Sequence, residues 1–212
     1  SGTTSRPKRV PLSGANLCAS ARQIATTLQF TPQDVGLNIM PLFHIHGLLA
    51  GLLAPLSAGS QVFCTPGFNA LRFFKWMDEA HPTWYTAVPT MHLAIASRGK
   101  HNADVLARHP LRFVRSSSSP MPPQLIQQLE AMFKTPLIES YGMTEAAHQM
   151  ASNPLPPLQR KPGSVGRAAG PQIGIRGEDG GLLGPGEVGE VVIRGPSVTR
   201  GYENNPKAND EA

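Results

Sequence analysis

Residues 111–140 have the sequence LRFVRSSSSPMPPQLIQQLEAMFKTPLIES. Two short, mostly apolar runs, 111–115 and 137–140, are typical of buried strands. The segment between them, 122–133, is expected to be a helix, with proline near its first turn, where the missing N–H costs no hydrogen bond. A strand, a helix and a second strand in this order favour an α/β fold with a mostly parallel sheet.

The same alternation of strands and helices extends toward the amino terminus. Ser13 is a suitable N-cap for one helix and Asn69 for another. Residues 47–56 are apolar all round, which predicts a fully buried helix. Further strands are predicted over 37–40, 61–64 and 83–88, and a further helix over 90–97. The sequence therefore predicts an α/β domain in which helices flank a mostly parallel sheet.

The character of the chain changes near Asn153. From there to Gly170 it is rich in proline and glycine and has no apolar period. Two short strands, 172–176 and 190–194, then follow around turn-forming residues, which is typical of antiparallel β structure. We therefore expect a core domain over 1–164 and a small antiparallel β subdomain over 165–212.

Composition narrows the classes of function. The 212 residues carry 19 Lys and Arg against 14 Asp and Glu, a net charge of +5, but the cations are scattered. This favours small anionic ligands and predicts no nucleic-acid partner. Cys18 and Cys64 lie in apolar sequence without metal-ligand spacing and are expected to be buried free thiols. Residues 39–56 are interrupted by Pro41 and Pro55, so no membrane span is predicted.

Polar clusters follow three of the predicted strands, where ligands of doubly wound sheets bind. The first, 43–47, holds two histidines two positions apart; a metal site there lacks a third ligand, so one pocket histidine and one structural histidine are expected. The second is the serine run 116–119, which is either a solvated loop or a cradle for a ring or an anion. The third, 139–145, offers an aromatic ring, a hydroxyl and a carboxylate together, as a nucleotide with Mg²⁺ requires.

The amino-terminal stretch Ser1–Lys8, SGTTSRPK, combines hydroxyls, a glycine and cations. Such a loop suits a triphosphate, because glycine permits close approach while hydroxyls, N–H groups and Lys8 contact the phosphates. The spacing is not that of a Walker loop. The alternative interpretation is an ordinary frayed terminus.

Ser1–Lys8 resembles the phosphate loop of the acyl-adenylate-forming, or AMP-binding, enzymes, which include acyl-CoA synthetases, luciferases and adenylation domains. Residues 141–145, YGMTE, resemble the second signature of that family. Within it, 41–53, 144–156 and the tail 194–206 are similar to oxalate–CoA ligases of plants and fungi. Pro120 is more similar to coumarate–CoA ligases. The resemblance runs through essentially the whole chain.

This resemblance implies a two-step acid–thiol ligase. ATP and a carboxylate would give an acyl-adenylate and pyrophosphate, and the thiol of CoA would then displace AMP. The residues that match the family motifs would hold ATP, Mg²⁺ and the carboxylate. Ser1, Gly2, Thr3, Thr4 and Lys8 would hold the β- and γ-phosphates, Thr144 the α-phosphate and Glu145 the Mg²⁺, while Tyr141 and Gly142 on one side and Ser117, Ser118 and Ser119 on the other would hold adenine.

The carboxylate substrate is a separate question. Oxalate is a compact dianion that needs hydrogen-bond donors and positive charge, whereas fatty or aromatic acids need an apolar tunnel. His44, Ser117 and His148 are the polar candidates for contact with the acyl carboxylate, with a surface loop as the alternative for His148. Oxalate is the first expectation, and another small or aromatic carboxylate such as 4-coumarate is the second.

The resemblance also implies a truncated large domain. The segment that precedes the phosphate loop in the family, its ribose-binding aspartate, its hinge and its carboxy-terminal domain have no counterpart in these 212 residues. Residues 1–5 are therefore expected to be poorly ordered and to bind ATP weakly. A rival expectation is a non-catalytic nucleotide-binding fragment or an incomplete gene product. The expected compartment is cytoplasmic or peroxisomal.

Overall fold

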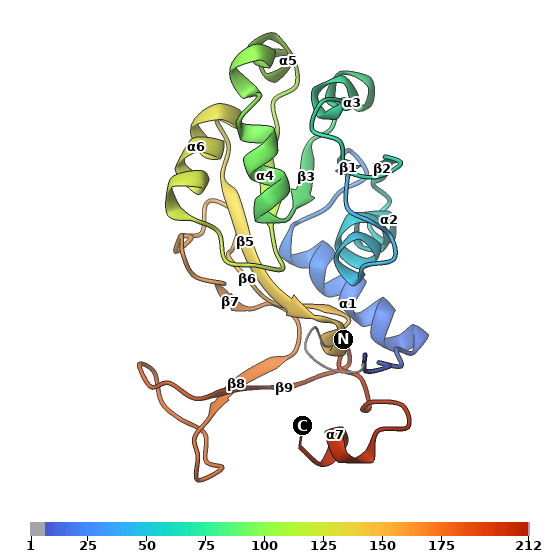
Figure 1. The fold of residues 1–212 in the computed structure, drawn as a ribbon, viewed down its shortest axis with the longest axis vertical. Coiled ribbons are helices and arrows are strands. Elements are labelled where there is room, and N and C mark those ends of the chain that lie inside the picture. The colour runs from blue at the N-terminus through green and yellow to red at the C-terminus, as the bar shows by residue number, and fades with distance from the viewer. Residues whose placement is uncertain (1–6, 212) are drawn as a thin grey trace.

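The computed structural model describes residues 7–211, which form a central sheet with helices on both faces and a separate two-stranded ribbon (Figure 1). This confirms the predicted α/β class. The elements in chain order are α1 (Gly14–Thr27), β1 (Val35–Asn38), η1 (His46–Leu53), α2 (Ala54–Ser57), β2 (Gln61–Cys64), α3 (Phe73–Ala80), β3 (Trp84–Ala87), α4 (Pro89–Ala96), η2 (Gly99–Asn102), α5 (Ala103–Arg108), β4 (Phe113–Ser116), α6 (Pro123–Phe133), β5 (Leu137–Met143), η3 (Thr144–Ala146), β6 (His148–Ser152), β7 (Arg167–Ala168), β8 (Gln172–Arg176), β9 (Glu190–Arg194) and α7 (Pro206–Asp210).

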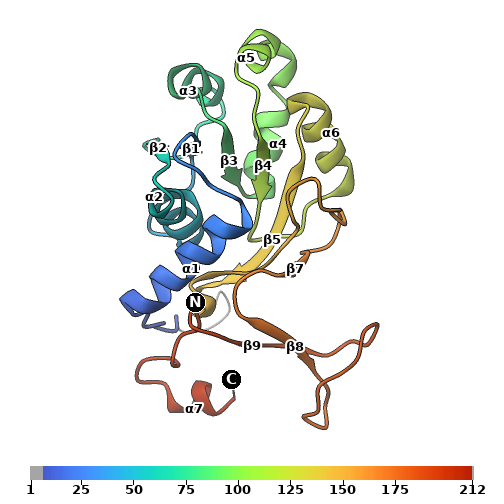
Figure 2. The same cartoon turned by 180° about the vertical axis from the view of Figure 1, so that it is seen from behind.

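The central sheet has the strand order β2-β1-β3-β4-β5-β6-β7. Its first five strands are parallel, β6 pairs antiparallel with β5, and β7 pairs antiparallel with β6. Strands β8 and β9 pair only with each other and extend away from the body of the molecule (Figure 2). The domain boundary at 164/165 stays a prediction; residues 167 and 168 still pair with the central sheet.

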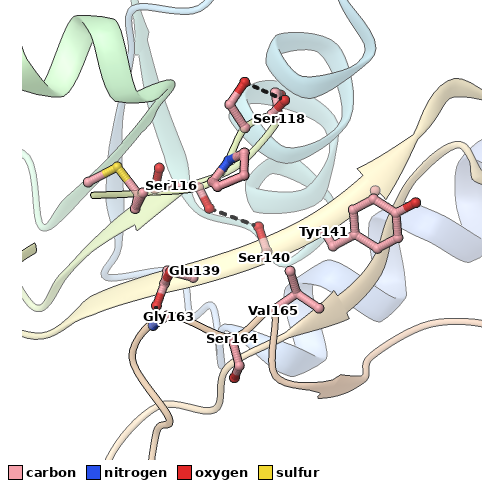
Figure 3. Close-up of a pocket in the computed structure, with 12 residues that line it drawn as sticks. Ser116, Ser118, Glu139, Ser140, Tyr141, Gly163, Ser164 and Val165 are labelled. Carbon is pink, nitrogen blue, oxygen red and sulfur yellow. Dashed lines mark hydrogen bonds between the residues drawn. The ribbon is translucent and has the colours of Figure 1, made fainter. Parts of the chain in front are cut away.

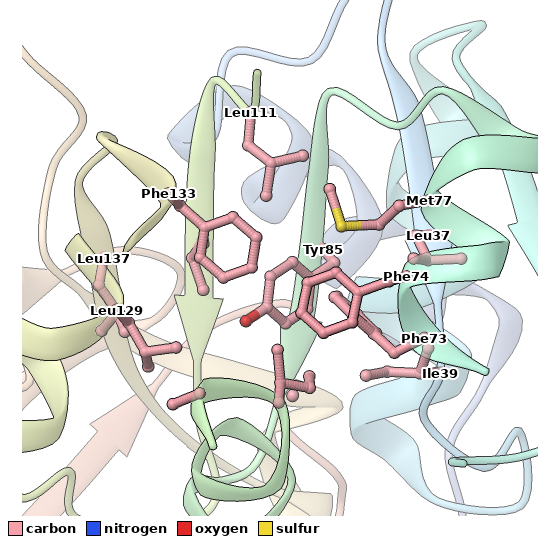
Figure 4. Close-up of a cluster of buried hydrophobic side chains, with 14 of the residues drawn as sticks. Leu37, Ile39, Phe73, Phe74, Met77, Tyr85, Leu111, Leu129, Phe133 and Leu137 are labelled. Carbon is pink, nitrogen blue, oxygen red and sulfur yellow. The ribbon is translucent and has the colours of Figure 1, made fainter. Parts of the chain in front are cut away.

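Successive residues of each central strand point to opposite faces, so each strand contributes to two cores. Tyr85 and Val114 lie in a cluster with α3, α4 and α6, which Figure 4 shows. Trp84 and Phe113, their neighbours in the chain, lie in a second cluster with α1, η1 and α2. This burial on both faces explains why the central strands are apolar runs rather than alternating ones.

The local signals near α1 act as expected. The Ser13 hydroxyl accepts a hydrogen bond from the N–H of Asn16 at 3.2 Å, and the Asn16 side chain accepts one from the N–H of Ser13 at 2.9 Å. This reciprocal capping box fixes the start of the helix.

Two predictions about burial are wrong. Cys18 and Cys64 are both exposed, because Cys18 lies on the outer side of α1 and Cys64 ends the edge strand β2. The apolar segment 47–56 is not a fully buried α-helix: its first part is the π-helix η1, and Leu56 in α2 is 49% exposed. One side of this segment packs on α1 and the sheet, and part of the other side is exposed to solvent.

Within the same described range, no helix has both the length and the apolar character that crossing a membrane requires.

Candidate active site

The carboxyl ends of the parallel strands bring together the polar clusters identified in the sequence. Strand β4 ends where the serine run begins, and its neighbour β5 carries Tyr141, so the serine run and Tyr141 lie at the same edge of the sheet. The Ser117 hydroxyl donates to the Ser140 carbonyl at 3.1 Å, and the Ser140 hydroxyl donates to the Ser116 carbonyl at 3.2 Å. These two bonds fasten the ends of β4 and β5 together.

A pocket of about 330 Å³ opens beside this fastening (Figure 3). Tyr141, 38% exposed, forms one side, and Val165 with its neighbours forms another (Figure 3). An exposed aromatic ring opposite backbone and small side chains suits a flat heterocycle. The pocket is lined by Ser116, Ser118, Ser119, Pro120, Met121, Glu139, Ser140, Tyr141, Gly142, Gly163, Ser164 and Val165.

The floor of the pocket contains a buried carboxyl group. Glu139 Oε2 accepts a hydrogen bond from the N–H of Gly163 at 2.8 Å, which anchors the segment 163–165 (Figure 3). Burial raises the pKa of the Glu139 carboxyl, an effect opposed by this hydrogen bond and by the charge of Arg160. The carboxyl therefore positions a wall of the pocket.

A fully buried arginine lies behind the serine run. Arg115 of β4 is 0% exposed, and its Nη1 donates to His46 Nε2 at 3.2 Å. Its Nη2 donates to His148 Nε2 at 3.1 Å and to the Gln149 side-chain oxygen at 3.2 Å. The Thr86 hydroxyl lies 2.7 Å from His46 Nε2 and 3.4 Å from Arg115 Nη1. Four elements, η1, β3, β4 and β6, thus converge on one cation.

The two imidazoles beside Arg115 are stacked, with centroids 4.9 Å apart and planes inclined by 15°. Burial and then the charges of His148, Arg115, His44 and His92 hold the pKa of His46 well below its usual value. Burial and then the charges of Arg115 and His44 do the same to the pKa of His148. Both rings are therefore neutral at neutral pH.

A second group of predicted site residues meets where residues 7–11 pack against the carboxy-terminal segment. The Lys8 ammonium lies 4.7 Å from the centroid of the Tyr202 ring. The Tyr202 hydroxyl donates to Glu145 Oε1 at 2.9 Å. Burial and then Glu145 raise the pKa of Tyr202, so its hydroxyl keeps its proton at neutral pH. Tyr202 thus links the end of the predicted phosphate loop to the predicted Mg²⁺ ligand.

Residues 7–211 contain no cluster of three or more histidine, cysteine, aspartate or glutamate side chains that would hold a metal by itself. Magnesium in nucleotide sites uses only one or two carboxylates and takes its other ligands from phosphates and water. A single carboxylate at Glu145, which is connected to Lys8 through Tyr202, is compatible with that donor set.

The remaining predicted site residues fall in different places. Ser1, Gly2, Thr3 and Thr4 lie outside the described residues. Thr144 begins η3 and is half-buried, next to the half-buried Gly142. His44 is exposed, and its Nδ1 accepts from the N–H of His46 at 3.1 Å. His148 is 2% exposed, so the surface-loop alternative for it is wrong.

The sequence reasoning missed five residues of these two groups: Thr86, His46 as the buried histidine of its pair, Arg115, Gln149 and Tyr202. One signal was available for Arg115. It lies two positions after Phe113, on the face of β4 that is otherwise apolar, so a charge there breaks the pattern of a buried strand.

Comparison with known proteins extends these observations. The family described as AMP-binding enzyme matches residues 1–203. An oxalate–CoA ligase of Arabidopsis thaliana is 47% identical over 213 residues, covering 99% of this chain and 41% of that protein. An oxalate–CoA ligase of Saccharomyces cerevisiae is 44% identical over 211 residues, covering 100% of this chain and 38% of that protein. The chain therefore spans about two fifths of the length of these relatives.

Among solved structures, ATP-bound MatB from Rhodopseudomonas palustris superimposes with a TM-score of 0.89 at 30% sequence identity. The match covers 100% of this chain and 41% of that chain.

Proposed function

Because the chain belongs to the family of AMP-binding enzymes, we propose that it forms part of an ATP-dependent acid–CoA ligase and that its carboxylate substrate is oxalate. The catalytic protein in this proposal includes segments outside these 212 residues. The two oxalate–CoA ligases described above support the choice of substrate.

The observation that carries the substrate proposal is the buried polar cluster behind Ser118. The hydroxyl of Ser118, which lines the pocket, lies 3.2 Å from His46 Nδ1, and His46 contacts Arg115. A fatty or aromatic acid would need an apolar tunnel behind Ser118. The groups found behind Ser118 are instead the guanidinium of Arg115 and the imidazoles of His46 and His148. Donors backed by positive charge suit a compact dianion.

The proposed reaction has two displacements. In the first, a carboxylate oxygen attacks the α-phosphorus of ATP and pyrophosphate leaves; in the second, the CoA sulfur attacks the acyl carbonyl carbon and AMP leaves. Both reactants in the first step are anions, so the site must reduce their repulsion. We assign Lys8 and Ser1–Thr4 to the β- and γ-phosphates and Thr144 to the α-phosphate. A magnesium ion held by Glu145 supplies further charge neutralisation when bound.

The pocket gives the nucleotide base a place in the same proposal. Tyr141 stacks on one face of adenine, while Gly142, Ser119 and the backbone of Ser118 line the space around it, and the Ser118 hydroxyl is left for the carboxylate. Ser117 fixes the Ser140 backbone of β5. The pocket volume of about 330 Å³ and the exposed ring of Tyr141 support this assignment. The compartment, cytoplasmic or peroxisomal, stays a prediction.

Carboxylate-dependent exchange of labelled pyrophosphate into ATP tests the proposal. The complete encoded protein should exchange with oxalate at concentrations where 4-coumarate and octanoate give none. Glu145→Gln should lower exchange with every acid, whereas Glu203→Gln, at an exposed ion pair with Arg9, should leave it unchanged. Exchange with 4-coumarate but not oxalate would replace the substrate and keep the ligase. No exchange with any acid would favour the non-catalytic nucleotide-binding alternative.

A further inference from the structure

Arg115 is a buried cation whose partners are all neutral. Among residues 7–211 no carboxylate forms an ion pair with it, and its Nε is buried without a hydrogen-bond acceptor. Burial lowers the pKa of the guanidinium to about 9, so it is still charged at neutral pH. An unpaired buried cation is costly for a fold, and proteins retain one where its charge has another use.

The hydrogen bonds of Arg115 determine which nitrogen of each imidazole carries the proton. A guanidinium only donates, so Nε2 of His46 and Nε2 of His148 must both be unprotonated acceptors. The neutral rings therefore carry their protons on Nδ1. In His46 that N–H donates to the Ser118 hydroxyl oxygen, 3.2 Å away.

This arrangement reaches the pocket through Ser118. Because its oxygen accepts from His46, the Ser118 hydroxyl proton is available to a ligand in the pocket that Ser118 lines. With Nε2 of His46 unprotonated, the Thr86 hydroxyl donates to it and shares its single lone pair with Arg115, and the Thr86 oxygen accepts from Arg115 at 3.4 Å. A continuous chain of hydrogen bonds, all pointing the same way, connects the buried cation with the pocket.

Backbone conformation at both ends of the cluster supports a role in binding. Ser118 has φ +78° and His148 has φ +94°, and neither is a glycine. Non-glycine residues persist in such conformations only where the surrounding structure holds them, and these cluster at functional sites. Here the two strained residues lie at the pocket end of the chain and beside the guanidinium.

We propose that Arg115 is a positioning residue for the acyl carboxylate: it holds His46 and His148 as neutral acceptors, aims the Ser118 hydroxyl at the ligand, and places an uncompensated positive charge behind it. The ligand class is a compact anion, above all a dianion such as oxalate. This inference rests on the proposed function, which it deepens by naming the source of selectivity for charge.

The test compares two arginine variants of the complete protein. Arg115→Met should raise the KM for oxalate roughly 10- to 100-fold at pH 8, the range for charge-assisted hydrogen bonds, and should change the KM for ATP less than about 3-fold. Arg112→Met, which removes a cation three residues earlier at the other end of the strand, should leave both KM values unchanged. A purely structural role for Arg115 would lower both affinities together.

The pH profile separates positioning from packing. In the wild type, burial is the main reason that His46 and His148 resist protonation, and the charges that face them add to it: His148, Arg115, His44 and His92 for His46, and Arg115 and His44 for His148. Without the guanidinium, protonation becomes easier, and the KM of Arg115→Met for oxalate should fall again between pH 8 and 5.5. The wild-type KM should stay level over that range. If the KM for oxalate depended on pH in the same way in the wild type and in Arg115→Met, the proposal would be overturned.

Two measurements keep the proposal testable if Arg115→Met does not fold or if oxalate is not the substrate. Long-range ¹H–¹⁵N spectra of labelled histidine should show His46 and His148 as neutral Nδ1–H tautomers at pH 6; protonated or Nε2–H rings would overturn it, whether or not the protein exchanges pyrophosphate. Ser118→Ala keeps the cation and both imidazoles but removes the hydroxyl at the pocket end of the chain, and it should raise the KM of the accepted carboxylate about 10-fold. An unchanged KM would also overturn it. If no carboxylate supports exchange in the wild type, the proposed function fails first.

Discussion

Two arginines three residues apart occupy opposite ends of strand β4 and have opposite surroundings. Arg112, just before the strand, is 35% exposed at its side chain and pairs with Asp34 through two bonds of 3.0 and 3.1 Å. Arg115, near the end of the strand, is fully buried and contacts only neutral groups among the described residues. Arg112, which is partly solvated, therefore has a carboxylate partner, whereas the buried Arg115 has none among the described residues.

The difference separates a group that stabilises the fold from one that serves a ligand. Arg112 and Asp34 connect the start of β4 with the loop before β1, where Thr83 also donates to Asp34 at 2.9 Å. Arg115 lies beside the carboxyl edge, where ligands of parallel sheets bind. A carboxylate built into the protein there would compete with an anionic substrate for the same charge.

Lowering the pH should destabilise the fold mainly at the Arg115 end of β4, and this is the largest effect that we expect. His92 of α4 donates from Nε2 to the Arg115 carbonyl at 3.2 Å, and its Nδ1 accepts from Tyr85. Burial lowers the pKa of His92 to about 4 from an ordinary 6.5. The unfolded chain therefore binds the proton more readily, so stability is complete above pH 6.5 and declines as the pH falls to 4, by about 3 kcal/mol for this residue.

Urea unfolding of the complete protein at several pH values measures this decline. His92→Gln should flatten the slope between pH 6.5 and 4, although it lowers stability at pH 7 by removing buried hydrogen bonds. His46 and His148, whose pKa values are also lowered, should keep part of the slope. His101→Gln, at an exposed position, is the matched control and should retain the wild-type slope. Equal slopes for wild type and His92→Gln would contradict the assignment.

Removing Asp34, the counter-charge of Arg112 at the start of β4, should lower the free energy of unfolding by less than acid does through His92. It should leave carboxylate binding unchanged. Asp34→Ala leaves Arg112, Thr83 and the N–H of Thr31 without their common acceptor. Because Arg112 can turn to solvent, we expect a loss of about 2 kcal/mol rather than the larger penalty of a fully buried pair. Urea unfolding should show this loss, with the KM for oxalate unchanged.

Asp104→Ala is the control for this experiment. It breaks an exposed pair with Arg108 that solvent already screens, so the free energy of unfolding should change much less than in Asp34→Ala. A large rise in the KM for oxalate in Asp34→Ala would show that the two ends of β4 are coupled, and the comparison between the arginines would then fail.

The sequence predicts the fold well where turns and apolar runs delimit an element. Strands β2, β8 and β9 begin and end at the predicted residues, since each is bounded by glycine, proline or polar turn residues. Strand β6 (His148–Ser152) was missed, because its buried His148 and Gln149 do not look like core residues. They are buried through hydrogen bonds to Arg115, which no local pattern reports.

The same limit applies to the site. The serine run and Tyr141 line one pocket because the end of β4 lies beside β5, which carries Tyr141; that this pocket holds a nucleotide stays a prediction. The choice between His44 and His46 was beyond the sequence, since it depends on where the π-helix begins. The helix starts at His46 and turns that ring toward Arg115, 69 positions later in the chain. Long-range polar contacts of this kind have no periodic signal.

A third cation, Lys8, can be compared with the two arginines, and the effects predicted for its surroundings are the smallest. Its ammonium lies over the Tyr202 ring, and the hydroxyl of that ring donates to Glu145. Tyr202→Phe keeps the ring beneath Lys8 and removes only the bond to the carboxylate. One lost hydrogen bond to a charged acceptor, partly replaced by water at this half-buried position, should cost about 1 kcal/mol, or roughly a 5-fold rise in the KM for MgATP.

Tyr202→Ala removes the cation–π contact as well and should raise that KM by a further factor of about 3. Neither change should alter the KM for oxalate, because Tyr202 does not contact the Arg115 cluster. Initial rates of pyrophosphate exchange at varied MgATP and at saturating carboxylate measure both effects. If Tyr202→Phe behaves as the wild type while Tyr202→Ala is impaired, the ring alone matters, and Glu145 is positioned by other contacts. If oxalate binding weakens too, the nucleotide end and the carboxylate end of the site are not independent, and Arg115 cannot be credited with the acyl carboxylate alone.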